Sequence, residues 1–95
     1  MSSSPSFTYC PAGVWTTIFR GVLPFIGYFK VYTGSNPAVA PDTKFEYSAW
    51  SISPIWAASG TKPAYAETQI WIGPTGYAEL KVKTNKNSQF KATGI

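Results

Sequence analysis

Apolar and polar residues alternate over short stretches along most of this chain, and prolines and glycines separate those stretches. No stretch carries apolar residues at the three-to-four-residue spacing of an amphipathic helix. A period of two, interrupted by turn residues, is typical of short β-strands. We therefore expect an all-β protein with strands at residues 13–20, 25–33, 44–51, 65–72 and 77–83, and a short edge strand around residues 55–57 as a sixth candidate.

The alternation also predicts which side of a strand faces the core. In residues 44–51 the charged side chains of Lys44 and Glu46 mark the outer face, and Trp50 falls on that face by parity. The inner face is then expected to consist of Phe45, Tyr47 and Ala49. Trp56 follows a proline, so we expect it in a connection near a sheet edge.

The sequence GPTG at residues 73–76 predicts a hairpin between the last two of these strands. Its proline suits the second position of a type I turn, and its second glycine suits the left-handed position of a three-residue loop. This register places Ile70 opposite Leu80 on an apolar face and Trp71 opposite Glu79 on a polar face. Turn chemistry and side-chain pattern therefore agree on the pairing.

The chain is 95 residues long, which suits one domain with a single modest core. We expect a small antiparallel β-sandwich of about five to seven strands, with a partly open β-barrel as the alternative. Residues 1–12 and 85–95 are polar over most of their length, so we expect them to be arm-like end segments of this domain.

The composition is unusually poor in charge, with 13% charged, 44% hydrophobic and 17% aromatic residues. Soluble domains usually contain about a quarter charged residues. Disordered chains are polar and poor in aromatics, so this composition excludes disorder over most of the length. A surface with so little charge is typical of proteins that face other protein copies or sugars.

The net charge of +4 is unevenly distributed, because four lysines follow the last acidic residue, Glu79. This basic patch consists of Lys81, Lys83, Lys86 and Lys91. Basic segments can meet nucleic acid, an acidic partner or an anionic membrane. We favour a solubilising role, because phosphate-binding surfaces usually include arginine and Arg20 is the only arginine here.

Several catalytic and metal-binding chemistries are excluded by residues that the chain lacks. It contains no histidine and one cysteine, so it cannot form a Ser-His-Asp triad or a histidine or multi-cysteine metal site. Its four acidic residues are expected on outward strand positions or in a connection, so we expect no enzyme activity, metal or cofactor. Cys10 is expected to be a buried structural thiol, with an intermolecular disulfide as the alternative.

The N-terminus lacks the basic start and continuous apolar segment of a signal peptide. The longest apolar stretch is short and contains Pro24, so we expect no membrane span. We expect cytoplasmic synthesis, incorporation into a larger particle, or a sequence numbered after removal of a leader.

Our first functional hypothesis is a structural subunit that self-associates or coats a larger particle, as capsid decoration and filament proteins do. Interface centres are rich in Tyr, Trp and Phe and poor in charge. The residues expected to form the assembly or ligand surface are Trp50, Trp56, Tyr65, Gln69, Trp71 and Tyr77.

Two other hypotheses use the same aromatic residues. Trp71, Tyr65 and Gln69 share a strand face, which would suit a metal-free carbohydrate-binding module or lectin. Aromatic stacking on bases with lysines beside phosphates would suit single-stranded nucleic-acid binding, which we rank last because basic residues are few. A single tryptophan in a small β-domain is more often a core residue, and a β-bulge would reverse the assignment of Trp50 and Trp71.

Overall fold

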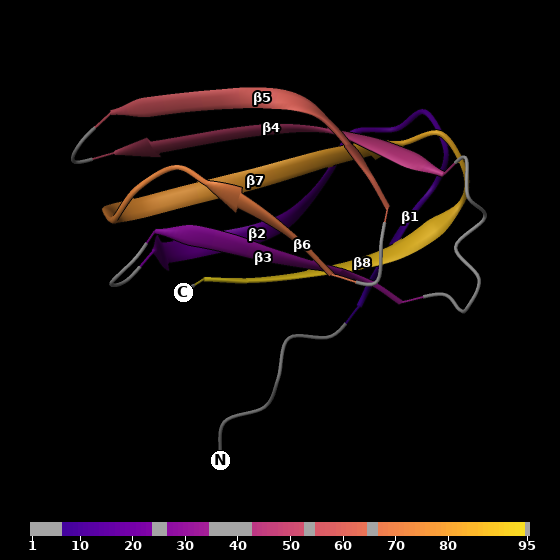
Figure 1. The fold of residues 1–95 in the computed structure, drawn as a ribbon, viewed down its shortest axis with the longest axis horizontal. Helices are drawn as coiled ribbons and strands as arrows, with labels where there is room; N and C mark the ends of the chain where they lie inside the picture. The colour runs from indigo at the N-terminus through magenta and orange to yellow at the C-terminus, as the bar shows by residue number, and fades with distance from the viewer. Residues whose placement is uncertain (1–6, 24–26, 35–42, 53–54, 65–66, 95) are drawn as a thin grey trace, which may run out of the picture.

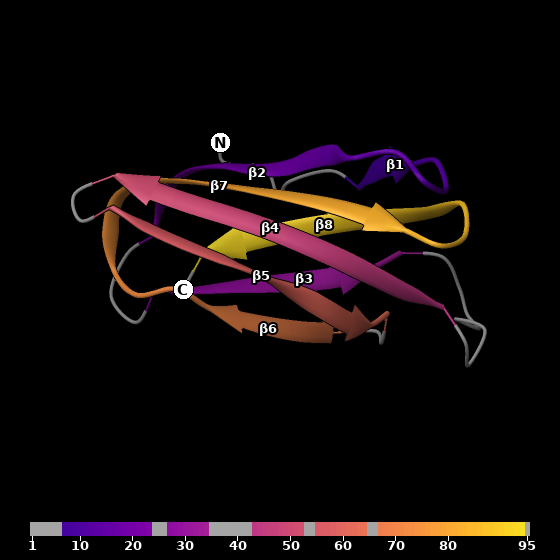
Figure 2. The same ribbon diagram turned by 90° about the horizontal axis from the view of Figure 1, so that it is seen from above.

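The structure, a computed structural model, describes residues 7–23, 27–34, 43–52, 55–64 and 67–94. The described residues form eight strands and no helix. The strands are β1 (Thr8–Cys10), β2 (Thr16–Leu23), β3 (Tyr28–Thr33), β4 (Lys44–Ile52), β5 (Trp56–Pro63), β6 (Glu67–Trp71), β7 (Thr75–Thr84) and β8 (Ser88–Gly94). They make two antiparallel four-stranded sheets (Figures 1 and 2). The predicted antiparallel β-sandwich is confirmed, with eight strands instead of five to seven.

The strand pairing is that of a long hairpin folded over on itself. Sheet 1 has the order β1-β8-β3-β6 and sheet 2 the order β2-β7-β4-β5. The pairs β1–β8, β2–β7, β3–β6 and β4–β5 are nested around the β4–β5 connection, and β3–β8 and β4–β7 complete the sheets. Eight strands in two such sheets form a jelly roll.

The core lies between the two sheets and consists of the inward members of the alternating patterns. Phe45 of sheet 2 and Phe90 of sheet 1 are both buried, and their ring centroids lie 5.2 Å apart in an edge-to-face arrangement. Ala49 is also buried and Tyr47 packs against the core, whereas Trp50 lies on the outer face of β4, as predicted. Each aromatic side chain in such a core contributes a large buried apolar area.

The predicted hairpin across residues 73–76 is wrong. β6 pairs with β3 and β7 pairs with β2 and β4, so the two strands lie in different sheets. Ile70 and Leu80 are both buried, as the pattern required, but they enter the core from opposite sheets. Alternation determines which side of a strand is buried and does not distinguish a neighbour in the same sheet from a strand across the sandwich.

Residues 72–74 carry the chain from sheet 1 to sheet 2, and Gly27 holds this crossing in place. The carbonyl oxygen of Gly27 accepts hydrogen bonds from the amides of Ile72 and Gly73, each at 3.0 Å. Gly27 and Gly73 have φ angles of +83° and +98°, in the region that favours glycine. Beyond the crossing, the hydroxyl of Thr75 donates to the carbonyl oxygen of Ile52 at 2.6 Å and joins the start of β7 to the end of β4.

The end segments do not form arms over their described lengths. Residues 88–94 form β8, an inner strand of sheet 1 paired with β1 and β3, and Phe90 is fully buried. Thr8–Cys10 forms β1 against β8, and residues 1–6 lie outside the described part. Cys10 is buried, as predicted, and burial raises the pKa of its thiol.

The first predicted strand and the short edge strand differ most from the prediction. The strand expected at 13–20 is β2, which begins at Thr16 and shifts register against β7 between Thr17 and Phe19, so Ile18 and Phe19 both pack against the core. Trp15 precedes the strand and is exposed, with the Lys83 ammonium 5.4 Å from its ring centroid. The short edge strand expected at 55–57 is the eight-residue β5.

Candidate functional site

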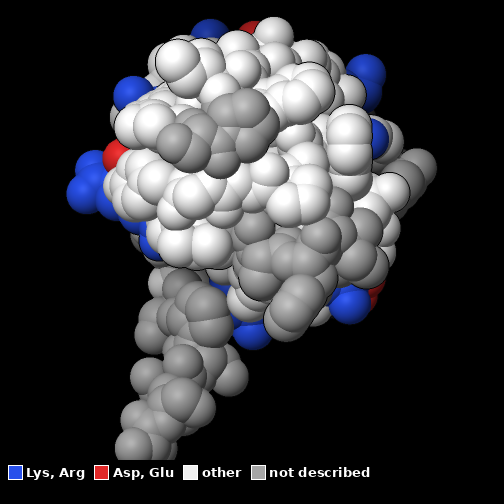
Figure 3. Space-filling view, turned by 90° about the vertical axis from the view of Figure 1, so that its left-hand side faces the viewer, with Lys and Arg blue, Asp and Glu red and all other residues white. Residues whose placement is uncertain are grey.

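One end of the sandwich carries no charged residue over a wide area. Residues 21–29, 47–61 and 68–78 contain no Asp, Glu, Lys or Arg. The described parts of all three segments meet where the β2–β3, β4–β5 and β6–β7 connections lie, at the left of Figure 1. Seen from that side, the described middle of the surface carries no charged residue, and charged residues of both signs lie around its border (Figure 3).

This uncharged end exposes large apolar side chains. Ile55 in the β4–β5 connection is 86% exposed and Val22 near the end of β2 is 59% exposed. Trp71 at the end of β6 and Trp56 at the start of β5 are 53% and 46% exposed. With Ile52 at the end of β4, these five residues define the uncharged end. Apolar side chains gathered at one place on a small domain usually mark an interaction surface.

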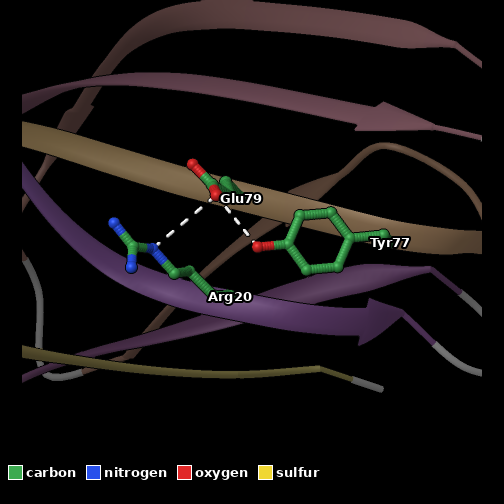
Figure 4. A network of polar contacts seen from close by, with 3 residues as sticks. All are labelled: Arg20, Tyr77 and Glu79. Atoms are coloured by element: carbon green, nitrogen blue, oxygen red, sulfur yellow. Dashed lines mark hydrogen bonds and ion pairs between the residues drawn. The ribbon is translucent and has the colours of Figure 1, made fainter.

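The outer face of sheet 2 borders the uncharged end with a small polar network (Figure 4). The Tyr77 hydroxyl donates a hydrogen bond of 2.9 Å to Glu79 Oε2, and Arg20 Nε lies 3.6 Å from the same oxygen. The hydrogen bond to Glu79 raises the pKa of Tyr77. The ring of Tyr77 also packs at 5.7 Å, centroid to centroid, against Trp50 on the neighbouring strand. Trp50 and Tyr77 are thus half-buried against each other.

Aromatic and amide side chains share the outer face of sheet 1. The pairs Tyr9–Gln89, Tyr32–Lys91, Lys30–Gln69 and Tyr28–Trp71 place these residues on one side of the sheet. We call this the aromatic face. The Lys91 ammonium lies 4.8 Å from the ring centroid of Phe7 and 5.1 Å from that of Tyr32. Lys30 Nζ lies 3.5 Å from Glu67 Oε2, and that carboxylate raises the pKa of Lys30.

The four lysines of the predicted basic patch are divided between the sheets. Lys81 and Lys83 lie on β7 in sheet 2, and Lys83 Nζ is 3.5 Å from Glu46 Oε2. Lys86 lies in the β7–β8 turn, and Lys91 lies on β8 in sheet 1. The four residues therefore do not form one continuous surface.

A hollow of about 530 Å³ lies on sheet 2 at the opposite end from the uncharged end. Its rim includes Lys44, Glu46, Thr61, Lys83 and Asn85. Glu46 and Lys83 form an ion pair there, and Lys44 adds a second positive charge to the lining.

The predicted surface residues are distributed over three places. Trp71 and Gln69 lie on the outer side of β6 in sheet 1, whereas Trp50 and Tyr77 lie on the outer face of sheet 2. Trp56 lies at the start of the edge strand β5, and Tyr65 is outside the described residues. Of the six, only Trp56 and Trp71 belong to the uncharged end.

Sequence reasoning missed the aliphatic members of the uncharged end, Val22, Ile52 and Ile55, and it missed Tyr9 on the aromatic face. The sequence does contain a signal for the first group, since all three lie within long stretches without charge. Their convergence depends on the jelly-roll topology, which places three separate connections at one end.

Within the described ranges, no three His, Cys, Asp or Glu side chains gather closely enough to hold a metal ion. The described part of the chain contains no apolar helix of membrane-spanning length. No protein-family model, curated protein or solved structure matches this chain.

Proposed function

We propose that this protein is a non-enzymatic structural subunit that binds other protein surfaces, in copies of itself or in a larger particle, through the uncharged end. The observation that carries the proposal is the exposure of Val22, Ile52, Ile55, Trp56 and Trp71 at a place without charge. Removing such side chains from water is favourable by roughly 25 cal/mol per Å² of apolar area.

The layout of this end supports a protein partner. Protein interfaces typically have an apolar centre with aromatic residues and a polar rim, and charged residues are depleted from the centre. Here two tryptophans and three aliphatic residues are exposed in stretches without charge, and charged residues of both signs lie around the border of this end (Figure 3). Tryptophans in such centres often contribute most of the binding energy.

The fold is compatible with this role and does not decide it. Jelly rolls occur in viral capsid domains and also in lectins, so the topology alone favours neither assembly nor sugar binding. The argument therefore depends on the surface residues.

Oligomeric state tests the proposal directly. Size-exclusion chromatography with light scattering at micromolar concentration should show an oligomer for the native chain. Ile55→Asp places a carboxylate at the most exposed position of the uncharged end, where folding depends little on the side chain. We expect this variant, alone or combined with Val22→Asp, to dissociate the oligomer because a buried unpaired charge is strongly unfavourable.

Gln89→Glu is the matched control, because it adds the same charge on the outer face of sheet 1, away from the uncharged end. It should leave the oligomer intact. A native chain that is monomeric and binds no protein particle would contradict the proposal. Binding to lipid vesicles that Ile55→Asp abolishes, without protein association, would also contradict it.

The aromatic face supports a second candidate function, carbohydrate binding. Tyr9, Tyr28, Tyr32 and Trp71 offer ring faces on one side of sheet 1, and Gln69 and Gln89 offer amide donors and acceptors beside them. Polar groups placed among aromatic surfaces are typical of small-ligand sites. These side chains come from all four strands of sheet 1, so the face could contact several units of an extended polysaccharide.

Tryptophan fluorescence titrated with a panel of polysaccharides tests this second function. Binding through the aromatic face should be weakened at least tenfold by Tyr9→Ala, which removes an exposed ring at the sheet edge. Ile55→Asp should leave it unchanged. An unaltered signal across the panel would exclude carbohydrate binding at this face.

A further inference from the structure

The four strands at the sheet borders differ in how they are protected against pairing with another chain. Natural sheets protect their borders with short strands, bulges, charges or prolines. β1 has three residues, β6 has five and begins with Glu67, and β2 is interrupted by two register shifts. β5 has eight residues in unbroken register with β4 and no charge before Lys62. Among the described border strands, β5 is therefore the one with the longest unprotected stretch, residues 56–61, because Lys62 and Pro63 come only at its end (top of Figure 1).

The hydrogen-bond pattern shows which backbone groups of β5 point away from β4. The Ala64 amide donates to the Thr43 carbonyl at 3.0 Å, one position beyond the last residue pair of the β4–β5 ladder. Because antiparallel ladders alternate, residues 62, 60, 58 and 56 also point their backbone groups at β4. Ala57, Ser59 and Thr61 then direct their N–H and C=O groups to the open edge. Pro63 has no N–H and belongs to this outward set, so the β4–β5 ladder loses no hydrogen bond at that position.

We propose that β5 pairs antiparallel with β5 of a second copy of this chain, around a two-fold axis at Ser59, and joins two copies of sheet 2 into one eight-stranded sheet. This inference rests on the proposed assembly function and identifies the partner and the edge that it uses. In this register Ser59 pairs with itself and Ala57 pairs with Thr61 on either side. Every outward donor between Ala57 and Thr61 then has a carbonyl partner, and Pro63 is left outside the pairing.

Side chains favour the same register. Two-fold pairing at Ser59 places Trp56 opposite Lys62 of the other copy, twice by symmetry. These are non-hydrogen-bonded positions, where cross-strand side chains approach most closely. An ammonium over a tryptophan face is a favourable contact, and the chain already makes one between Lys83 and Trp15. The residues between them are small, with alanine opposite glycine, so the two backbones can approach without a clash.

Ser59→Pro tests the pairing, because it removes an N–H that points to the open edge. The N–H groups of β5 that bond to β4 are kept. The native chain should be dimeric or larger by light scattering. Ser59→Pro should lose the β5–β5 pairing, so the mass of the smallest species detected should fall from that of a dimer to that of a monomer. Ser59→Ala keeps the N–H while removing the same hydroxyl, and it should behave as the native chain. Circular dichroism on all three monitors the fold.

Disulfide trapping tests the register independently of the proline variant. Directly opposite residues in hydrogen-bonded pairs have Cα atoms about 5.5 Å apart, within the range that a disulfide spans. Ser59→Cys should therefore form a covalent dimer under mild oxidation. Thr61→Cys should not, because four residues of offset separate the two cysteines by about 13 Å along the strand. Native Cys10 is buried and does not compete.

The outcomes separate this inference from the assembly function. An oligomer that survives Ser59→Pro, or equal crosslinking of Thr61→Cys and Ser59→Cys, would overturn β5 pairing while leaving assembly through the uncharged end in place. A monomeric native chain without a partner particle would overturn both. Loss of association in Ser59→Pro, with selective trapping at position 59, supports the pairing.

Discussion

The amide of Gly73 donates a 3.0 Å hydrogen bond to the carbonyl oxygen of Gly27, and this contact ties the β2–β3 connection to the crossing between the sheets. A Cβ atom at Gly27 would overlap the backbone of Gly73 and Pro74. The two connections that meet here also lie at the uncharged end, so this backbone contact positions the proposed interface.

Gly27→Ala should destabilise the protein by on the order of 3 kcal/mol, because it adds left-handed backbone strain and a steric overlap. Gly13→Ala is the matched control, since Gly13 has a similar φ of +78° and open space where its Cβ would lie. Gly13→Ala should lower the free energy of unfolding by about 1 kcal/mol, through backbone strain alone. Urea unfolding measures both, and equal losses would show that a Cβ at Gly27 is accommodated without a steric cost.

Phe90→Ala should cost about 3–5 kcal/mol, because it leaves a cavity against Phe45 in the core. This is a large part of the stability of a domain of this size. Gln89→Ala, one position away on the exposed face, should change the unfolding midpoint little. A small effect of Phe90→Ala would mean that β8 is not part of the folded core.

The Tyr77–Glu79 hydrogen bond predicts a loss of stability at alkaline pH. The pKa of Tyr77 is raised from 10.0, first because its hydroxyl donates to the Glu79 carboxylate. The neutral form is therefore favoured in the folded state, so its contribution is complete below about pH 10 and is lost as pH rises through the folded pKa. The stability difference between the native chain and Tyr77→Phe should shrink across that interval. A difference independent of pH would contradict the assigned bond.

Cys10 should be unreactive in the folded protein. Burial raises the pKa of its thiol, and the thiol donates a hydrogen bond of 3.4 Å to the Thr8 carbonyl. A thiol-specific reagent at pH 8 should modify the native chain much more slowly than the unfolded chain in urea, because the thiolate is the reactive form. Equal rates in the two states would show that β1 does not hold the Cys10 side chain in the core.

The sequence was informative about faces and less informative about partners. Alternation placed Phe45, Ala49, Ile70 and Leu80 in the core and Trp50 and Trp71 outside, and the structure agrees on each. It could not show that β6 and β7 lie in opposite sheets, because inward side chains look the same from either sheet. The GPTG turn chemistry was misleading, since Gly73 serves the crossing instead of a hairpin.

The strand at residues 88–94 illustrates a different limit. Phe90 and Ala92 alternate there with Gln89 and Lys91, so the period-two signal was present. Its polar neighbours favoured a tail, and only pairing with both β1 and β3 makes it an inner strand. The uncharged end was likewise visible only as separate stretches, because its members are brought together by three distant connections.

The place of β8 between β1 and β3 also determines when this protein can fold during synthesis. β1 is synthesised before the other described strands, yet its strand partner is residues 88–90. Sheet 1 cannot close until β8 has emerged, whereas the β4–β5 hairpin can form as soon as residue 63 is free. Long-range pairing of this kind slows folding. The apolar segments made before β8 therefore stay exposed to chaperones and to neighbouring chains until β8 is in place.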